Sequence, residues 1–393
     1  MIAMERRHFL KGALSGVAGA LLVGGCGDSR SRTTCNRTIG DAHRIGVFSL
    51  AIDPGGTLLA SGGSDALIKL WHLPDGALLS TLTGHTQDVV ALAISPDGTR
   101  LAAGSADSTV KLWSLSDGSL LGTLAGHTLP VAGLAFTADV QLMASGSADA
   151  TVKLWNGVDG SLLATLVGHT LPGAGLAFTA DGQLLASGSA DATVKLWNVV
   201  DGSLLATLIG HTLAVTDVAA SPDGTLLVSS SKDQTLNLWS LPDGGLLSTI
   251  PTQAGWVDAL LFSPDGARLV TGGSNDGNAV VLWSMPTWVP AKTLTGHLGE
   301  VKAVAMTPDQ SMVASGGLDM TIRLWHAPSG GLVEVIRDHS NVVNALAIAP
   351  DGKTLVSGST DRSIRFWNLP SGSYAGSASD PALPVQTVVS FTC

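Results

Sequence analysis

A short phrase recurs through most of this 393-residue chain and constrains its fold more than any other feature. The twelve residues SGSADATVKLWN occur unchanged at 145–156 and at 187–198. Close variants end in six further tryptophans, and the eight tryptophans lie 42 residues apart, except for one gap of 44 between Trp239 and Trp283. A fixed period of this length is typical of architectures in which each repeat is one supersecondary unit. The repeat therefore predicts one closed body, although the length alone would allow two or three domains.

Each repeat contains four short apolar segments separated by turn residues. The repeat that ends near Gly126 is an example. Its four apolar segments are VVALAIS, TRLAAGS, TVKLWSL and SLLGTLAG. Pro-Asp-Gly separates the first two, and Asp107 stands in the turn between the second and the third. Pro and Gly at these places suit tight hairpins. Four antiparallel strands every 42 residues predict an all-β propeller of eight four-stranded blades over residues 35–393, with seven blades as the alternative.

A Gly-His pair, an Asp in the turn and a terminal Trp recur together, and in this the chain resembles the WD-repeat β-propeller family from about Cys35 to the C-terminus. The residue after each Trp departs from that family, because it is His, Ser or Asn rather than Asp. The resemblance implies a hydrogen-bonded tetrad of His, Ser, Asp and Trp in each blade. A buried indole N–H needs an acceptor, which a Ser hydroxyl can provide. The residues assigned to these tetrads are His43, Ser61, Asp65 and Trp71; His85, Asp107 and Trp113; His127, Ser145, Asp149 and Trp155; His169, Ser187, Asp191 and Trp197; His211, Ser229, Asp233 and Trp239; Thr271, Asp276 and Trp283; His297, Ser315, Asp319 and Trp325; His339, Ser357, Asp361 and Trp367.

Two tetrads are incomplete. Ala103 replaces Ser in the second repeat, and Gln253 replaces His in the sixth, which also has one extra residue before Trp283. We expect these two blades to be the looser ones. A Ser-His-Asp set could also indicate a hydrolase. An active site occurs once, however, whereas this set recurs around the ring, so we assign it a structural role.

The same resemblance implies that partners are recognised by the third and fifth residues after each His and by the residue before each tetrad Asp. The candidate partner-binding residues are Phe48, Trp256, Asp258, Glu300, Lys302 and Asn344. Trp256 is not a repeat tryptophan, and a Trp among charged neighbours is typical of an interaction hot spot. The alternative is that Trp256 packs into the space left by the missing His of the sixth repeat.

Residues 1–25 lie outside the repeat and predict an export signal. Arg6-Arg7 followed by Phe9-Leu10-Lys11 resembles the bacterial twin-arginine signal. The apolar stretch 12–23 is shorter than the roughly 20 residues that a membrane-spanning helix needs. Val23–Cys26 resembles a lipobox, which makes Cys26 the predicted lipidation site, although an ordinary signal with an incidental cysteine is the alternative. Residues 26–34 would form a flexible tether. These features predict a lipoprotein of the bacterial cell envelope, membrane-anchored and facing the periplasm or the exterior.

Both ends of the repeat region could complete the last blade. Cys35–Ile39 fits a fourth strand, and so does Tyr374–Ser379, so the sequence leaves the closing strand open. Cys35 and Cys393 lie in these terminal segments and could form a disulfide in an oxidising compartment, with two free thiols as the alternative.

The net charge and the cysteine spacing limit the classes of function that this chain can have. The net charge is −10 and no basic run follows the first residues, which argues against a nucleic-acid partner. None of the three cysteines has metal-ligand spacing. We therefore expect a monomeric, non-enzymatic scaffold that binds other proteins and needs no cofactor. The alternative is a periplasmic propeller enzyme or small-ligand-binding protein with its site at the channel mouth.

Overall fold

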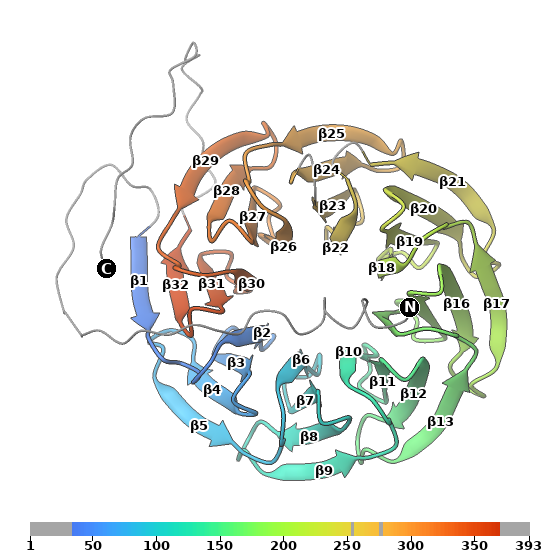
Figure 1. Ribbon diagram of the computed structural model, residues 1–393, viewed down its shortest axis with the longest axis horizontal. Helices are drawn as coiled ribbons and strands as arrows, with labels where there is room; N and C mark the ends of the chain where they lie inside the picture. Colours follow the sequence, from blue (N-terminus) through green and yellow to red (C-terminus); the bar gives the residue numbers. More distant parts are fainter. Residues whose placement is uncertain (1–33, 253–254, 275–277, 370–393) are drawn as a thin grey trace, which may run out of the picture.

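A computed structural model describes residues 34–252, 255–274 and 278–369, which form eight four-stranded sheets arranged as blades around one axis (Figure 1). The prediction of an all-β, eight-bladed propeller is confirmed. Each of the first seven blades is a meander of four consecutive antiparallel strands, as expected for segments joined by tight turns. Among the described residues, no helix is long and apolar enough to cross a membrane.

The strand bounds follow the repeat closely. Blades one to four contain β2 (Val47–Ile52), β3 (Leu58–Gly63), β4 (Ile68–His72) and β5 (Leu78–Leu82); β6 (Val89–Ile94), β7 (Arg100–Ser105), β8 (Val110–Ser114) and β9 (Leu120–Leu124); β10 (Val131–Phe136), β11 (Leu142–Ser147), β12 (Thr151–Asn156) and β13 (Leu162–Val167); β14 (Gly173–Phe178), β15 (Leu184–Ser189), β16 (Thr193–Asn198) and β17 (Leu204–Ile209). Blades five to eight contain β18 (Val215–Ala220), β19 (Leu226–Ser231), β20 (Thr235–Ser240) and β21 (Leu246–Pro251); β22 (Val257–Phe262), β23 (Arg268–Gly273), β24 (Val280–Ser284) and β25 (Val289–Leu294); β26 (Val301–Met306), β27 (Met312–Gly317), β28 (Ile322–His326) and β29 (Gly331–Ile336); β30 (Val343–Ile348), β31 (Thr354–Ser359) and β32 (Ile364–Asn368), with β1 (Thr34–Ile39).

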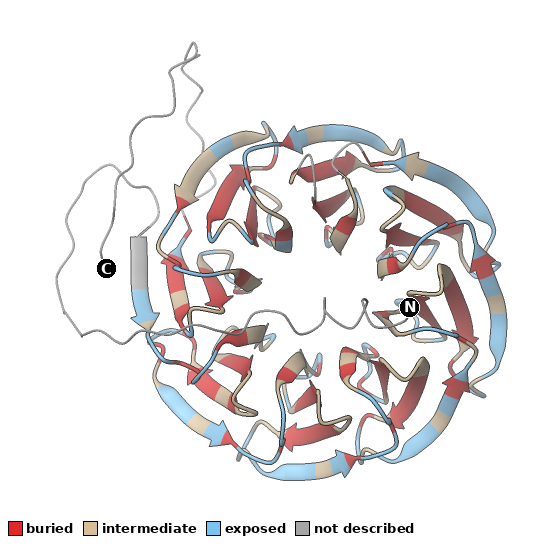
Figure 2. Cartoon of the chain, viewed as in Figure 1, coloured by how far each residue is buried: buried red, intermediate tan, exposed pale blue. Residues whose placement is uncertain are grey.

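The core lies between the blades rather than within any one of them. Trp113 of blade two packs against Ile68 and Leu82 of blade one, and Trp155 of blade three packs in the same way against Val110 and Leu112 of blade two. Eight such clusters join neighbouring blades, and each contains one repeat tryptophan. The outermost strands are largely exposed, whereas the inner three strands of each blade carry most of the buried residues (Figure 2). Each blade therefore depends on its neighbour to bury its apolar face.

The ring is closed by the N-terminal strand. β1 pairs antiparallel with β32, with Cys35 opposite Trp367 and Ile39 opposite Ile364, so β1 is the fourth strand of blade eight (Figure 1). β1 begins at Thr34, one residue inside the segment predicted as a tether. The predicted signal 1–25, the lipidation site Cys26, the C-terminal strand candidates and Cys393 all lie outside the described residues, so the predictions about them and about the disulfide stay open.

Candidate functional site

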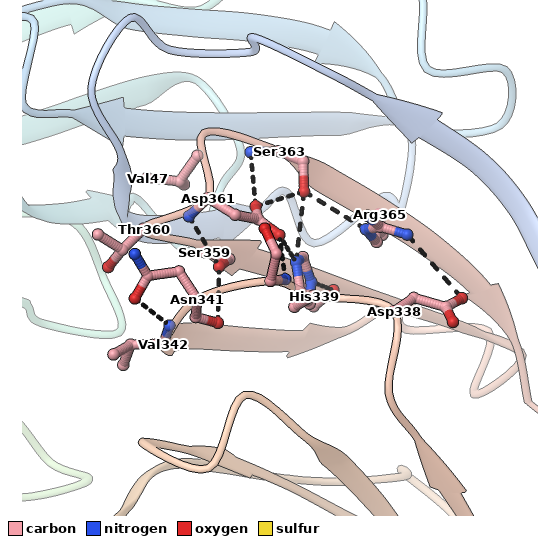
Figure 3. A network of polar contacts seen from close by, with 12 residues as sticks. Val47, Asp338, His339, Asn341, Val342, Ser359, Thr360, Asp361, Ser363 and Arg365 are labelled. Atoms are coloured by element: carbon pink, nitrogen blue, oxygen red, sulfur yellow. Dashed lines mark hydrogen bonds and ion pairs between the residues drawn. The ribbon is translucent and has the colours of Figure 1, made fainter. Parts of the chain in front are cut away.

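The tetrad of blade eight shows how each blade is held together. His339 Nδ1 lies 2.8 Å from Asp361 Oδ2 (Figure 3). On the other side of the ring, His339 Nε2 lies 2.7 Å from Ser357 Oγ. Trp367 Nε1 donates to the same Ser357 hydroxyl over 2.9 Å. The protons run in one direction: the indole donates to the hydroxyl, the hydroxyl to Nε2, and Nδ1 to the carboxylate. Every polar group of this buried chain is thereby satisfied.

The same arrangement recurs in blades one, three, four, five and seven. The His–Asp, His–Ser and Trp–Ser contacts all fall between 2.8 and 3.0 Å, and the residues that make them are His43, Ser61, Asp65, Trp71, His127, Ser145, Asp149, Trp155, His169, Ser187, Asp191, Trp197, His211, Ser229, Asp233, Trp239, His297, Ser315, Asp319 and Trp325. The His in the loop before the first strand thus holds the Asp in the turn between the second and third strands. We call the side of the disc formed by these loops and turns the loop face.

The charges of the tetrad in blade three are set by its surroundings. Burial is the largest effect on the carboxyl of Asp149 and would raise its pKa, but hydrogen bonds from Thr151, from the N–H of Thr128 and from His127 outweigh it and lower the pKa to about 2. Burial, again the largest effect, lowers the pKa of His127 although Asp149 opposes it. The imidazole is therefore neutral at pH 7 and the carboxylate is charged. The side chain of this His is fully buried, which suits a structural joint rather than a site open to substrate.

Blade two lacks the hydroxyl that joins the His to the Trp in the complete tetrads. His85 still lies 2.9 Å from Asp107, but Ala103 provides no hydroxyl. Within the described part of the chain, His85 Nε2 and Trp113 Nε1 are both buried without a hydrogen-bond partner. Two unpaired polar atoms in one place cost free energy, in agreement with the expected weakness of this blade.

Blade six keeps a hydrogen-bond acceptor for its indole N–H. Trp283 Nε1 donates to Thr271 Oγ1 over 3.1 Å, so threonine takes the place of serine. Gln253 and Asp276 lie outside the described residues.

Three of the six candidate partner-binding residues, Asp258, Glu300 and Lys302, interact where blades six and seven meet on the loop face, and a fourth, Trp256 of blade six, lies on the side of blade five. Glu300 and Lys302 form an ion pair. Burial first, and then the neighbouring Glu300, raises the pKa of Asp258 to about 7. The Lys232 ammonium lies 5.6 Å from the centroid of the Trp256 ring, within the range of a cation–π contact. We call Trp256, Asp258, Glu300 and Lys302 the blade-six/seven cluster.

The other two candidates lie at the seam between blades eight and one. Asn344 Nδ2 donates to the carbonyl of Val47 over 2.8 Å and to Thr360 Oγ1 over 2.9 Å. Both amide hydrogens are therefore used inside the propeller, where they bond the last blade to the first. Phe48, the next residue after Val47 in β2, is partly buried.

Two residues of this region were missed by the sequence reasoning. Asp217 in β18 accepts the N–H of Val218 over 2.9 Å and that of Leu260 in blade six over 3.2 Å, and burial raises its pKa to about 6. Ser274, which follows β23, is buried beside Asp258. A signal for Asp217 was present in the repeat, because the corresponding residues of the other blades are Ser49, Ala91, Gly133, Gly175, Ala259, Ala303 and Ala345.

Hollows are also present on the opposite face. One, of about 490 Å³, lies between blades one and two and is lined in part by Asp53 and Arg100. Another, of about 500 Å³, lies between blades seven and eight and is lined in part by Pro308 and Lys353. The described residues contain no group of three or more His, Cys, Asp or Glu side chains placed to hold a metal ion.

Comparison with known proteins agrees with this geometry. The WD40 family, described as "WD domain, G-beta repeat", matches the chain in eight segments, 33–72, 76–114, 118–156, 160–198, 202–240, 244–284, 288–326 and 330–368. The crystal structure of the computationally designed protein Ika8 is similar with a TM-score of 0.74 and 31% identity, over 83% of this chain and 97% of that one. The lissencephaly-1 homolog of Monosiga brevicollis is 41% identical over 49 residues, and the match spans 12% of each protein. The chain therefore belongs to the WD40 repeat family.

Proposed function

We propose that this protein is a non-enzymatic scaffold that holds one or more other proteins on its loop face. The observation that carries the proposal is the blade-six/seven cluster. Its aromatic ring and three charged side chains lie on a face whose third and fourth blades carry Pro130, Ala132 and Pro172 at the corresponding positions. Tryptophan is among the residue types enriched at interface hot spots, and charged side chains around it can steer and orient a partner.

The mechanism is rigid display. The tetrads fix the loops before the first strands to the turns between the second and third strands, so the loop face loses little conformational freedom when a partner binds. A surface that is already ordered binds its partner more tightly, because less conformational entropy is lost on binding. This mechanism requires no covalent chemistry. WD40 propellers in general serve as platforms for other proteins, which supports this assignment.

The test is crosslinking in the native cells followed by capture of the propeller. We expect Trp256→Ala to lose at least one partner that the parent protein captures. Val200→Ala, in an exposed turn on the opposite face, is the matched control and should keep every partner. A Trp256→Ala protein that is folded and still captures the full set of partners would contradict the role of the cluster.

We further propose that the propeller is monomeric and is held on a bacterial membrane by a lipid on Cys26 after export through the twin-arginine route. Cys26→Ser should then release the mature protein from the membrane fraction, and replacing Arg6 and Arg7 by Lys should keep it inside the cell. Membrane retention of the Cys26→Ser protein would refute the lipid anchor without affecting the scaffold proposal.

A further inference from the structure

The charge of the propeller is distributed unevenly among its blades. Residues 34–46 and 337–369, which form blade eight and its connections to the neighbouring blades, contain six Lys or Arg and four Asp. In the stretch of chain that forms each of the other seven blades, Asp and Glu outnumber Lys and Arg by one to three. Blade eight is therefore a positively charged sector of a ring that is otherwise acidic.

The exposed arginines of the described part of the chain all lie in or beside blade eight. They are Arg37 in β1, Arg44 in the loop before β2, Arg337 directly after β29 and Arg362 in the turn between β31 and β32. The remaining four arginines of the described residues are buried or half-buried. We call the four exposed residues the blade-eight arginines. Three of them lie at the loop-face end of the blade, and Arg37 lies on its rim.

The charge of these arginines is largely available to solvent. Three of the four form no ion pair with any described residue, although the charge of Arg37 is felt by Asp75 of blade one. Arg362 Nη1 lies 3.3 Å from Asp41 Oδ1, but both side chains are more than half exposed, so water and salt screen this pair. An anionic partner can therefore reach all four guanidinium groups.

The chain also enters the propeller at this blade. β1 is the outermost strand of blade eight and lies on the rim between β29 and β5 (Figure 1). It begins at Thr34, eight residues after Cys26, and eight residues of fully extended chain span at most roughly 29 Å. A lipid on Cys26 would hold the rim of blade eight within this distance of a bilayer. Arg30 and Arg32 stand in the connecting sequence and add to the same charge.

We infer that blade eight docks on anionic lipid headgroups through the blade-eight arginines, so that the disc stands on its edge at the membrane. This inference rests on the lipid anchor under the proposed function and specifies how the propeller is oriented. Guanidinium groups pair with lipid phosphates through parallel hydrogen bonds. Ile45, which follows Arg44 and is 51% exposed, supplies an apolar side chain beside them. An acidic protein would also suit the arginines, but it would not account for their position at the blade that carries the tether.

The experiment uses chain 26–393 with Cys26→Ser, which contains every residue that the structure describes and carries no lipid. Binding is measured by co-sedimentation with vesicles of phosphatidylglycerol and phosphatidylcholine in equal parts, and with vesicles of phosphatidylcholine alone. We expect binding to the mixed vesicles only. The binding should weaken as sodium chloride is added, because salt screens the attraction between the arginines and the headgroups.

Paired variants identify the blade that binds. Each Lys or Arg near an anionic surface raises the binding constant roughly fivefold, so Arg337→Gln combined with Arg362→Gln should weaken binding by roughly 25-fold. Lys292→Gln combined with Lys302→Gln changes the net charge equally in blades six and seven and should bind like the parent. Melting temperatures establish that each variant is folded. Should the first pair not fold, Arg37→Gln combined with Arg44→Gln replaces it, with the same loss expected.

No binding to the mixed vesicles, or equal weakening by the blade-eight pair and the control pair, would overturn the inference. Loss of a captured protein from the blade-eight pair without any vesicle binding would assign the arginines to an acidic protein and would also overturn it. The lipid anchor is tested separately, by the membrane fraction of Cys26→Ser cells. Vesicle binding by the lipid-free chain can therefore fail while the anchor holds, and the anchor can fail while vesicle binding holds.

Discussion

His85 Nε2 and Trp113 Nε1 of blade two are both left without a partner among the described residues, because Ala103 stands where every other blade has a Ser or Thr hydroxyl. In blade three the corresponding atoms, His127 Nε2 and Trp155 Nε1, each lie 2.8 Å from Ser145 Oγ. The two blades are otherwise built alike, so they form a natural pair for measuring what one hydroxyl contributes.

We expect Ala103→Ser to stabilise the protein. The new hydroxyl can pair two buried atoms, and an unpaired buried group costs about 1–3 kcal/mol, so a gain of that order should appear in denaturant unfolding. Ser145→Ala should cost a similar amount. The hydrogen exchange of the Trp113 indole gives a local measure, which should slow in Ala103→Ser. Unchanged exchange together with unchanged unfolding would show that blade two satisfies these atoms in another way.

Acid should destabilise the propeller in two steps. The pKa of His85, His127, His169 and His211 is lowered in the fold, chiefly by burial, so the unfolded chain takes up these protons first and stability falls as the pH drops below about 6.5. The pKa of Asp65, Asp107, Asp149 and Asp191 is about 2 in the fold against an ordinary 3.8. Their contribution is complete above pH 4 and is lost as the pH falls toward 2. Unfolding midpoints measured from pH 8 to pH 3 test this, and a midpoint that stays constant below pH 6 would contradict it.

Asp217 should behave in the opposite sense. Burial raises its folded pKa to about 6, so its ionisation destabilises the fold increasingly as the pH rises from about 4 to 6. Asp217→Asn keeps an oxygen for the N–H groups of Val218 and Leu260 and removes the buried charge. We expect it to stabilise the protein at pH 8 by on the order of 1–3 kcal/mol relative to its effect at pH 4. Equal unfolding free energies for variant and parent at both pH values would count against this role. Asp201→Asn, in an exposed turn, is the control.

Removal of residues 34–39 should open the ring. Without β1, the edge of β32 and the apolar contacts of blade eight are exposed, and unpaired strand edges promote aggregation. We expect a lower melting temperature and self-association in gel filtration. A chain that ends at Leu369 is the control, since it retains β1, and it should melt like the parent. A lower melting temperature for that shorter chain would mean that the C-terminal segment also contributes to closure.

The strands and the tetrads could be predicted because they depend on short-range patterns. The alternation of VVALAIS and the Pro-Asp-Gly turn after it place β6 to within one residue. Ring closure could not be predicted, because both terminal segments carry the same strand pattern and the outcome depends on pairing with β32 at the far end of the chain. Asn344 shows the same limit. Its amide bonds to Val47, a residue 297 positions away that no local pattern connects to it, whereas its predicted role in binding a partner stays a prediction.

The pairing of β1 with β32 also sets the order in which the protein can be completed. β1 has no partner strand until translation has reached residue 368, because β32 lies in blade eight, about 330 residues after β1 in the chain. A nascent chain released at any earlier blade boundary keeps an open seam and an unmatched first strand, however many finished blades it contains. Closure therefore distinguishes chains that contain blade eight from chains that stop before it, through a contact that requires both β1 and β32.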